Sequence, residues 1–327
     1  MATNIHDALF KKTFSQIEHA TGELQAILPP GLTARIDFAT LTLCPGNYVD
    51  EDLRQRYSDL LFSAELAGKK ALLYVLFEHQ SSVDPLMLFR LLAYMVRIWE
   101  AHLQANPEAR RLPAIIPVVL HHSHSGWTAN VAFEDLLDVD ATVLAEIAPY
   151  VPHFRCLLDD LGGESEEALR ARAMSALGRL ALWCLKNSRD PELLVAQLGR
   201  WGELMRQVVR APNGKAAVGM IFGYMCAVDE TFGPDELLRL VAGEVGKEVE
   251  EAIVTTADIL RAQGRSEGLS KGLIGQRTML VKLLNQRFGA LPDDALARIN
   301  AAGPAELEAW FDRGLTVATF PEVLGDG

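Results

Sequence analysis

The sequence predicts an α/β fold, in which a mixed sheet of four or five strands has helices on both sides. Residues 72–77 form an apolar run that is rich in β-forming residues and as long as a buried strand, and residues 113–120 form a second such run. Residues 84–104, between these runs, carry apolar side chains at helical spacing. Strand, helix and strand in this order are the pattern of a parallel crossover.

The N-terminal elements come next in the chain. Residues 6–28 are predicted as one helix, because apolar side chains recur near helical spacing until the Pro-Pro-Gly sequence at 29–31. Residues 34–43 are predicted as a strand. Asp84 is a candidate cap for the crossover helix, with Pro85 at the first helical position.

Polar residues at the ends of two neighbouring predicted strands indicate a functional site. Residues 57–62 precede a turn at 67–70, and the strand that follows the turn runs toward Glu78 and Gln80. Glu78 and Gln80 are two residues apart, so they face the same way in a strand, and hairpin pairing would bring Asp59 beside them. Burying two carboxylates without a partner is costly. A divalent cation would satisfy both, and carboxylate oxygens are ligands that magnesium prefers.

Five short segments of the chain resemble a known family. The spacing Asp59…Glu78-x-Gln80 resembles the core of the PD-(D/E)xK nuclease superfamily. As a set, the segments resemble the recombination-promoting nuclease / putative transposase (Rpn) family over residues 5–250. The segments are His6-Asp7, Arg56–Phe62, Glu78–Ser82, Met87–Tyr94 and Leu112–His122.

The resemblance implies a restriction-endonuclease-like sheet and a DNA endonuclease that hydrolyses phosphodiester bonds with Mg²⁺ or Mn²⁺. It implies that Asp59 and Glu78 bind the metal, with the backbone carbonyl of His79 as a further ligand. Gln80 replaces the lysine that is usual in the superfamily; it carries no charge, but it can orient a water or a phosphate. Asp7 has two interpretations: an acid favoured by the helix dipole, or an accessory acid of the site.

The charge distribution bears on DNA as a partner. The net charge is −12, and residues 1–130 hold 11 basic and 13 acidic residues, whereas residues 131–327 hold 20 and 30. Phosphate contacts dominate affinity for nucleic acid, so the near-neutral front part is where DNA would bind. The acidic back half favours an alternative, an inactive nuclease-fold module that binds DNA or assembles with partners. The candidate DNA-binding residues, which an ordinary set of solvated charges would also explain, are Lys69, Lys70, Arg56 and Arg90.

Short sequence features bear on zinc binding, on the cysteines and on the cellular location. The sequence His121-His122-Ser123-His124 does not have the spacing of a structural zinc site, and a loop at a strand end is the favoured interpretation, although one histidine could line a cleft. The four cysteines lack metal-ligand spacing and fit reduced thiols. The chain shows no signal peptide and no membrane-length apolar run, so we expect a cytoplasmic protein.

The rest of the chain is predicted to be helical. Helices are expected at 166–187, 191–210, 213–228 and 234–260, and the glycine-spaced residues 261–275 are expected to form a flexible or weakly helical connector. Three short helices at 276–288, 293–301 and 304–316 would form a small unit or a docking face for a homodimer. The predicted division is a nuclease core at 1–130, a helical extension of the same domain at 131–260, the connector, and a small helical C-terminal domain at 276–327.

Overall fold

The computed structural model describes residues 5–44, 60–78, 83–123, 126–188, 190, 193, 196–228, 233–241, 243 and 245–325, except the side chains of 73–78, 198, 240 and 267–269. The chain divides into two compact units, residues 1–257 and 258–327. Among the described residues, none of the helices combines the length and the apolar character needed to cross a membrane.

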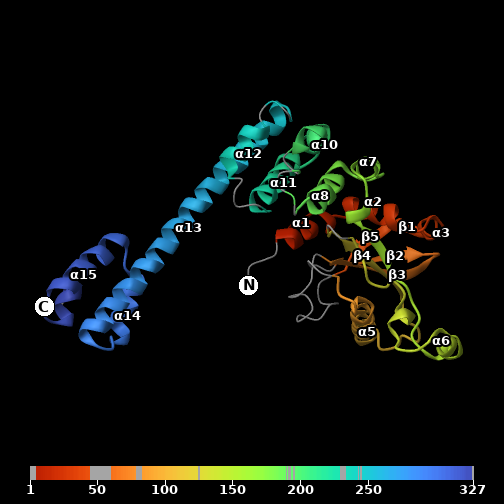
Figure 1. The fold of residues 1–327 in the computed structure, drawn as a ribbon, viewed down its shortest axis with the longest axis horizontal. Coiled ribbons are helices and arrows are strands. Elements are labelled where there is room, and N and C mark those ends of the chain that lie inside the picture. The colour runs from red at the N-terminus through yellow and green to blue at the C-terminus, as the bar shows by residue number, and fades with distance from the viewer. Residues whose placement is uncertain are drawn as a thin grey trace. The chain divides into compact units, whose positions relative to one another are not determined.

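A five-stranded mixed sheet lies at the centre of the first unit (Figure 1). The strands are in sequence order across the sheet. The first three are paired antiparallel, and the third, fourth and fifth are paired parallel. The predicted α/β class and mixed sheet are thereby confirmed. The strands are β1 (Ile36–Leu43), β2 (Leu60–Leu66), β3 (Lys69–Glu78), β4 (Ala114–His121) and β5 (Leu157–Asp160).

The β2–β3 hairpin has a two-residue turn, which is shorter than the turn predicted at 67–70 because Lys69 and Lys70 belong to β3. Leu66 pairs with Lys69, and the residues between them, Ala67 and Gly68, have φ of 51° and 75°. Positive φ at both central positions matches the right-handed twist of the strands, and the glycine adopts it without steric cost. This turn fixes the register of the strand that ends at Glu78.

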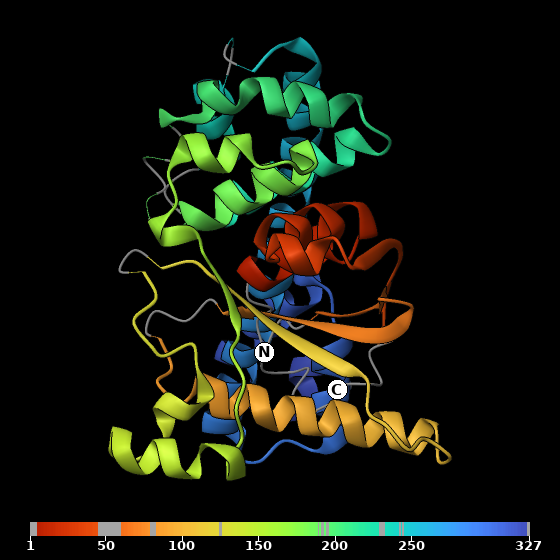
Figure 2. The same cartoon turned by 90° about the vertical axis from the view of Figure 1, so that its right-hand side faces the viewer.

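Helices cover both faces of the sheet. Helix α5 (Met87–Ala105) is the crossover between β3 and β4, and its Leu88, Leu91 and Ile98 are buried in a core with Leu61 of β2. Figure 2 shows α5 on one side of the strands and α1 (Ile5–Phe14) with α2 (Ile17–Ile27) on the other. The crossover prediction is confirmed. The prediction of a single helix over 6–28 is wrong, because the chain leaves helical geometry at Gln16, whose ψ is 124°.

A helical layer follows the sheet in the chain and packs on α1 and α2. Several details differ from prediction. The predicted helix 234–260 is divided, because one helix ends at Val241 and the next begins at Lys247. Strand β5 lies within a region predicted to be helical, and the predicted helix 166–187 is two helices, because residues 172–175 are not helical. Trp183 and Cys184 are fully buried. The remaining elements of this unit, in order, are α3 (Pro30–Thr33), η2 (Phe133–Leu136), α6 (Ala141–Ile147), η3 (Ala148–Tyr150), η4 (Leu161–Gly163), α7 (Glu166–Ala171), α8 (Ala176–Lys186), α10 (Leu198–Arg210), α11 (Gly214–Val228) and α12 (Pro234–Val241).

The boundary between the units falls within the long helix α13 (Lys247–Phe288). Residues 261–275 are therefore helical, although each glycine in a helix interior costs about 1 kcal/mol relative to alanine. The second unit also contains α14 (Asp293–Ala301), α15 (Pro304–Thr316) and α16 (Phe320–Leu324). Its own core includes Leu284, Leu307 and Trp310, whereas Leu315 is exposed.

Candidate functional site

The carboxyl ends of β3, β4 and β5 meet at one edge of the sheet. The backbone of Glu78 pairs with His121, and His121 pairs with Asp160. The register thus places the predicted acid Glu78 at an edge that also carries histidine and aspartate residues. The side chain of Glu78 lies outside the described part of the structure, as do all of Asp59, His79, Gln80 and Arg56. Their predicted convergence on a metal ion stays a prediction.

The end of β4 carries buried polar side chains. His121, His122 and Ser123 are each at most 5% exposed. The Nε2 atom of His121 is 2.7 Å from Oγ of Ser123, and its ring packs edge-on against Trp127 with 5.1 Å between ring centres. Asp160 accepts a hydrogen bond of 2.7 Å from the backbone N–H of Trp127. The loop after β4 is therefore tied to the end of β5.

The first turn of α1 meets the same strand end. Nδ1 of His6 is 2.7 Å from the hydroxyl of Tyr224 on α11, and the rings of His6 and His122 are 5.3 Å apart. Nδ1 of His122 is 3.4 Å from Oγ of Ser188. Burial raises the pKa of Tyr224, so its hydroxyl stays neutral. We call His6, His121, His122, Ser123, Ser188 and Tyr224 the strand-end cluster.

The strand-end cluster positions the turn that carries Asp7. Asp7 follows His6 directly in α1 and is partly buried. Tyr224 holds His6 from a helix that is 218 residues away in the sequence. Neither Tyr224 nor Ser188 lies in a motif of the sequence, and no local spacing signals their part in the cluster. His121 and His122 lie at a strand end, as predicted, and His124 of the suspected zinc sequence is outside the described residues.

The described residues also bear on metal binding. Within these residues, no group of three or more histidine, cysteine, aspartate or glutamate side chains has the geometry to hold a metal ion. This statement does not cover the predicted ligands Asp59, Glu78 and His79, because the structure describes only the backbone of Glu78 among them.

Three of the predicted DNA-binding residues are described. Lys69 and Lys70 begin β3, so they lie roughly 30 Å from the end of that strand at about 3.3 Å per residue. Arg90 forms a 2.7 Å ion pair with Asp84. Partial desolvation alone would raise the pKa of Asp84, but hydrogen bonds from Arg90 and the Leu86 N–H outweigh it and lower the pKa. Asp84 therefore anchors Arg90. The predicted cap is wrong: Leu86 is the N-cap residue of α5, Met87 is the first helical residue, and Asp84 accepts a hydrogen bond from the Leu86 N–H.

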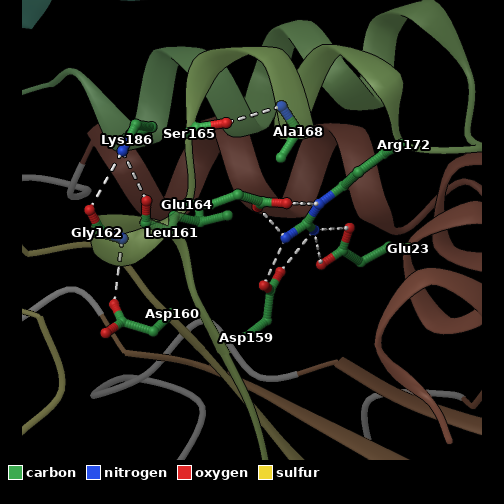
Figure 3. Close-up of polar contacts among 10 residues, drawn as sticks. All are labelled: Glu23, Asp159, Asp160, Leu161, Gly162, Glu164, Ser165, Ala168, Arg172 and Lys186. Atoms are coloured by element: carbon green, nitrogen blue, oxygen red, sulfur yellow. Dashed lines mark hydrogen bonds and ion pairs between the residues drawn. The ribbon is translucent and has the colours of Figure 1, made fainter.

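A second polar cluster lies on the other side of β5, facing α2 (Figure 3). The guanidinium of Arg172 binds Asp159 through two hydrogen bonds of 2.7 and 2.8 Å. It also contacts Glu23 at 3.2 Å and forms two hydrogen bonds with Glu164. Arg172 thus ties together α2, the end of β5 and the segment before α7. We call these four residues the Arg172 cluster.

The Arg172 cluster holds three carboxyl groups against one guanidinium. The Glu23 side chain is 4% exposed. Burial raises its pKa well above the ordinary value, the negative charge of Asp159 adds to this, and Arg172 only partly offsets it. The bidentate pairing keeps Arg172 charged: its own pKa is raised, because the hydrogen bonds and negative charges of its acidic partners outweigh desolvation. Burial and the charge of Asp159 thus favour the protonated form of Glu23.

Replacing Glu23 with glutamine should make stability less dependent on pH. An acid whose pKa is raised in the folded state contributes stability that is fully present below its unfolded pKa, near 4.5, and is lost as the pH rises through the folded value. The Tm of Glu23→Gln minus the Tm of the wild type should therefore increase as the pH rises. Thermal unfolding over a pH series measures it, with the exposed Glu167→Gln as control. A constant difference across the series would contradict the assignment.

Comparison with known sequences identifies the family. The sequence profile of a family described as "Putative transposase, YhgA-like" matches residues 4–214, more than half of the chain. The chain belongs to this YhgA-like family. The matched region includes all five strands and every residue of the strand-end cluster except Tyr224.

Curated relatives of this YhgA-like protein carry nuclease names, and some of them are called inactive. Over 300 residues the chain is 27% identical to recombination-promoting nuclease RpnA of Escherichia coli (strain K12), covering 89% of this chain and 96% of RpnA. It is 26% identical over 285 residues to the inactive recombination-promoting nuclease-like protein RpnE of the same strain, covering 86% and 90%. Recombination-promoting nuclease RpnC, also of that strain, is 32% identical over 124 residues, covering 38% and 41%. No solved structure gives a significant match.

Proposed function

We propose that this YhgA-like protein is a divalent-metal-dependent DNA endonuclease that hydrolyses phosphodiester bonds. The observation that carries the proposal is the match to a recombination-promoting nuclease along nearly the full length of both chains. The sheet supports it. Leu60, the residue after Asp59, pairs with Val75, and β3 continues from Val75 to Glu78 at the edge beside the strand-end cluster. We also propose that the fold is restriction-endonuclease-like.

The roles of the site residues follow from their chemistry. Asp59 and Glu78 would hold Mg²⁺ or Mn²⁺, with the backbone carbonyl of His79 as a further ligand and Asp7 as an accessory acid. The bound ion would lower the pKa of the attacking water and stabilise negative charge on the scissile phosphate. Gln80 would orient that water or the phosphate through hydrogen bonds. The strand-end cluster would keep the first turn of α1 in place against the ends of the strands.

DNA is the proposed partner, and salt should weaken its binding. Arg56, Lys69, Lys70 and Arg90 are the proposed phosphate contacts. Because Lys69 and Lys70 begin β3 and Glu78 ends it, these lysines would meet the duplex some distance from the bond that is cut. Each lost phosphate contact should reduce the slope of log affinity against log salt by about 0.9.

The second candidate function is an inactive module of the same fold that binds DNA or assembles with partners. The observation that favours it is the similarity to RpnE, whose name states that it is inactive, over most of both chains. The two candidates differ in one property, which is hydrolysis with metal. Homodimer formation through the C-terminal unit stays a prediction under either function.

Purified protein should nick supercoiled plasmid DNA in Mg²⁺ or Mn²⁺, but not in Ca²⁺ alone or in EDTA. Water activation needs a small and strongly polarising ion, whereas calcium takes more ligands at longer distances. Gel electrophoresis of plasmid with each ion provides the measurement. Absence of cutting with every ion, by protein that still binds DNA, would support the inactive module.

A further inference from the structure

A cavity of about 570 Å³ lies among α1, α2, α8, α10 and α11 in the first unit. Its described lining residues include none of the strand-end cluster or the Arg172 cluster. A volume of this size suits a small organic molecule. The cavity is therefore a separate candidate binding site, and its lining indicates the kind of ligand.

The starts of two helices line the cavity. Ala176 and Leu177 are the first two residues of α8, and Ala216 lies in the first turn of α11. Ser175 caps α8 by accepting a hydrogen bond from the N–H of Gly178. Among the described residues, no acceptor is found for the N–H groups of Ala176, Leu177 and Ala216. Unpaired N–H groups at the positive ends of two helix dipoles favour an anion.

His19 supplies an independent indication. It lines the cavity although it is only 7% exposed, and its Nδ1 is 2.7 Å from Oγ of Ser175. Oγ of Ser175 accepts the Gly178 N–H, and its hydroxyl proton is available to Nδ1 of His19. In the tautomer that accepts this proton, Nε2 carries the ring N–H, and the described residues provide no partner for Nε2. Burial lowers the pKa of His19 despite the nearby charge of Glu18, which favours the neutral ring.

Charged and apolar residues also line the cavity, beside the amides Gln16, Gln207 and Asn213. Lys12 is a cation at the cavity, and Glu18 is an acceptor suited to a hydroxyl group of a ligand. Val208, Pro212 and Met220 provide an apolar surface for an organic body. A ligand with an anionic end, an apolar body and hydroxyl groups matches all three features.

We propose that this cavity binds an organic phosphate monoester of about the size of a mononucleotide. The phosphate would lie against the starts of α8 and α11, with His19 and Lys12 as further donors. The organic part would lie on the apolar lining, with a hydroxyl group on Glu18. The proposal goes beyond the endonuclease activity and does not depend on it.

Calorimetric titration of the full chain with AMP, adenosine and inorganic phosphate tests the proposal. AMP should bind saturably with a Kd below about 1 mM, phosphate more weakly, and adenosine without saturation. Ala216→Glu should weaken AMP binding at least about tenfold, because it places a carboxylate in the cavity. This variant should fold normally, since an acid in the first turn of a helix is favourable. Lys12→Met should also weaken binding.

The matched control is Lys215→Gln, which makes the same change in net charge one residue away but does not line the cavity. It should bind AMP like the wild type. Adenosine binding as tightly as AMP, or equal AMP affinities of Ala216→Glu and wild type, would overturn the proposal. A 12-base-pair duplex provides the second arm. If Ala216→Glu weakens duplex binding while AMP does not bind, the cavity holds a DNA backbone phosphate and the proposal is overturned.

Discussion

Replacing Asp59 with alanine should abolish magnesium-dependent cutting of DNA. The variant lacks one of the two proposed carboxylate ligands, and a single carboxylate from Glu78 would hold the ion too weakly to polarise a water. We expect a loss of at least about a thousandfold, which corresponds to about 4 kcal/mol at 1.36 kcal/mol per tenfold. Initial rates of plasmid nicking, compared at equal protein and metal concentration, measure it.

Gln80→Ala is the comparison variant, because it should lose only part of the cutting activity. Gln80 is proposed to orient water or phosphate and not to bind the ion, so its variant should cut more slowly but should keep its affinity for Mn²⁺. Equal cutting by wild type and Asp59→Ala would trace the activity to a contaminating nuclease and would contradict the assignment of Asp59.

Replacing Arg172 with methionine should destabilise the first unit by about 3–5 kcal/mol, the usual cost of removing one partner of a buried ion pair. Arg172 is the cation of its cluster, and its side chain is 10% exposed. Without it, Asp159, Glu23 and Glu164 would face one another with no compensating positive charge. Chemical denaturation monitored by circular dichroism measures the change in the free energy of unfolding.

The control for this variant is Arg210→Met. Arg210 pairs with Glu248 at 3.1 Å, but both side chains are more than 60% exposed. Surface pairs of this kind contribute about 0–1 kcal/mol. A free energy of unfolding that falls equally in the two variants would show that the Arg172 cluster adds no special stability.

The central elements of the sheet could be predicted from the sequence because their signals are local. The β2–β3 hairpin follows from two apolar runs around a turn, and the β3–α5–β4 crossover follows from a change of apolar period. Strand β5 is different, because it has only four residues and two of them are Asp159 and Asp160. Its position in the sheet depends on pairing with β4, which no local pattern reveals.

Breaks between helices were harder to predict than the helices themselves. Apolar spacing continues through Gln16, so it does not mark the end of α1. The break before α8 did have a signal, because Ser175 is a good capping residue, and its hydroxyl accepts from the Gly178 N–H. The residue that requires this break is Arg172, whose acidic partners come from distant segments.

The backbone position of Glu78 could be predicted from the sequence, whereas the residues that support the strand end could not. Glu78 can be found from strand pattern and family resemblance, and the structure places its backbone at the edge where the strands end. Tyr224 reaches that edge from α11, and Ser188 reaches it from the turn after α8, both much later in the chain. Contacts over such separations depend on how the helical layer packs, and short-range sequence patterns do not reveal that packing.

A crystal of the protein soaked in Mn²⁺ gives the most direct test of the proposed metal site, because anomalous scattering locates the ion without reference to activity. The account predicts one ion bound by carboxylate oxygens of both Asp59 and Glu78, at about 2.0–2.2 Å, which is close to the distances that magnesium adopts. Asp59 and Glu78 pointing to opposite faces of the sheet, with no ion between them, would contradict it.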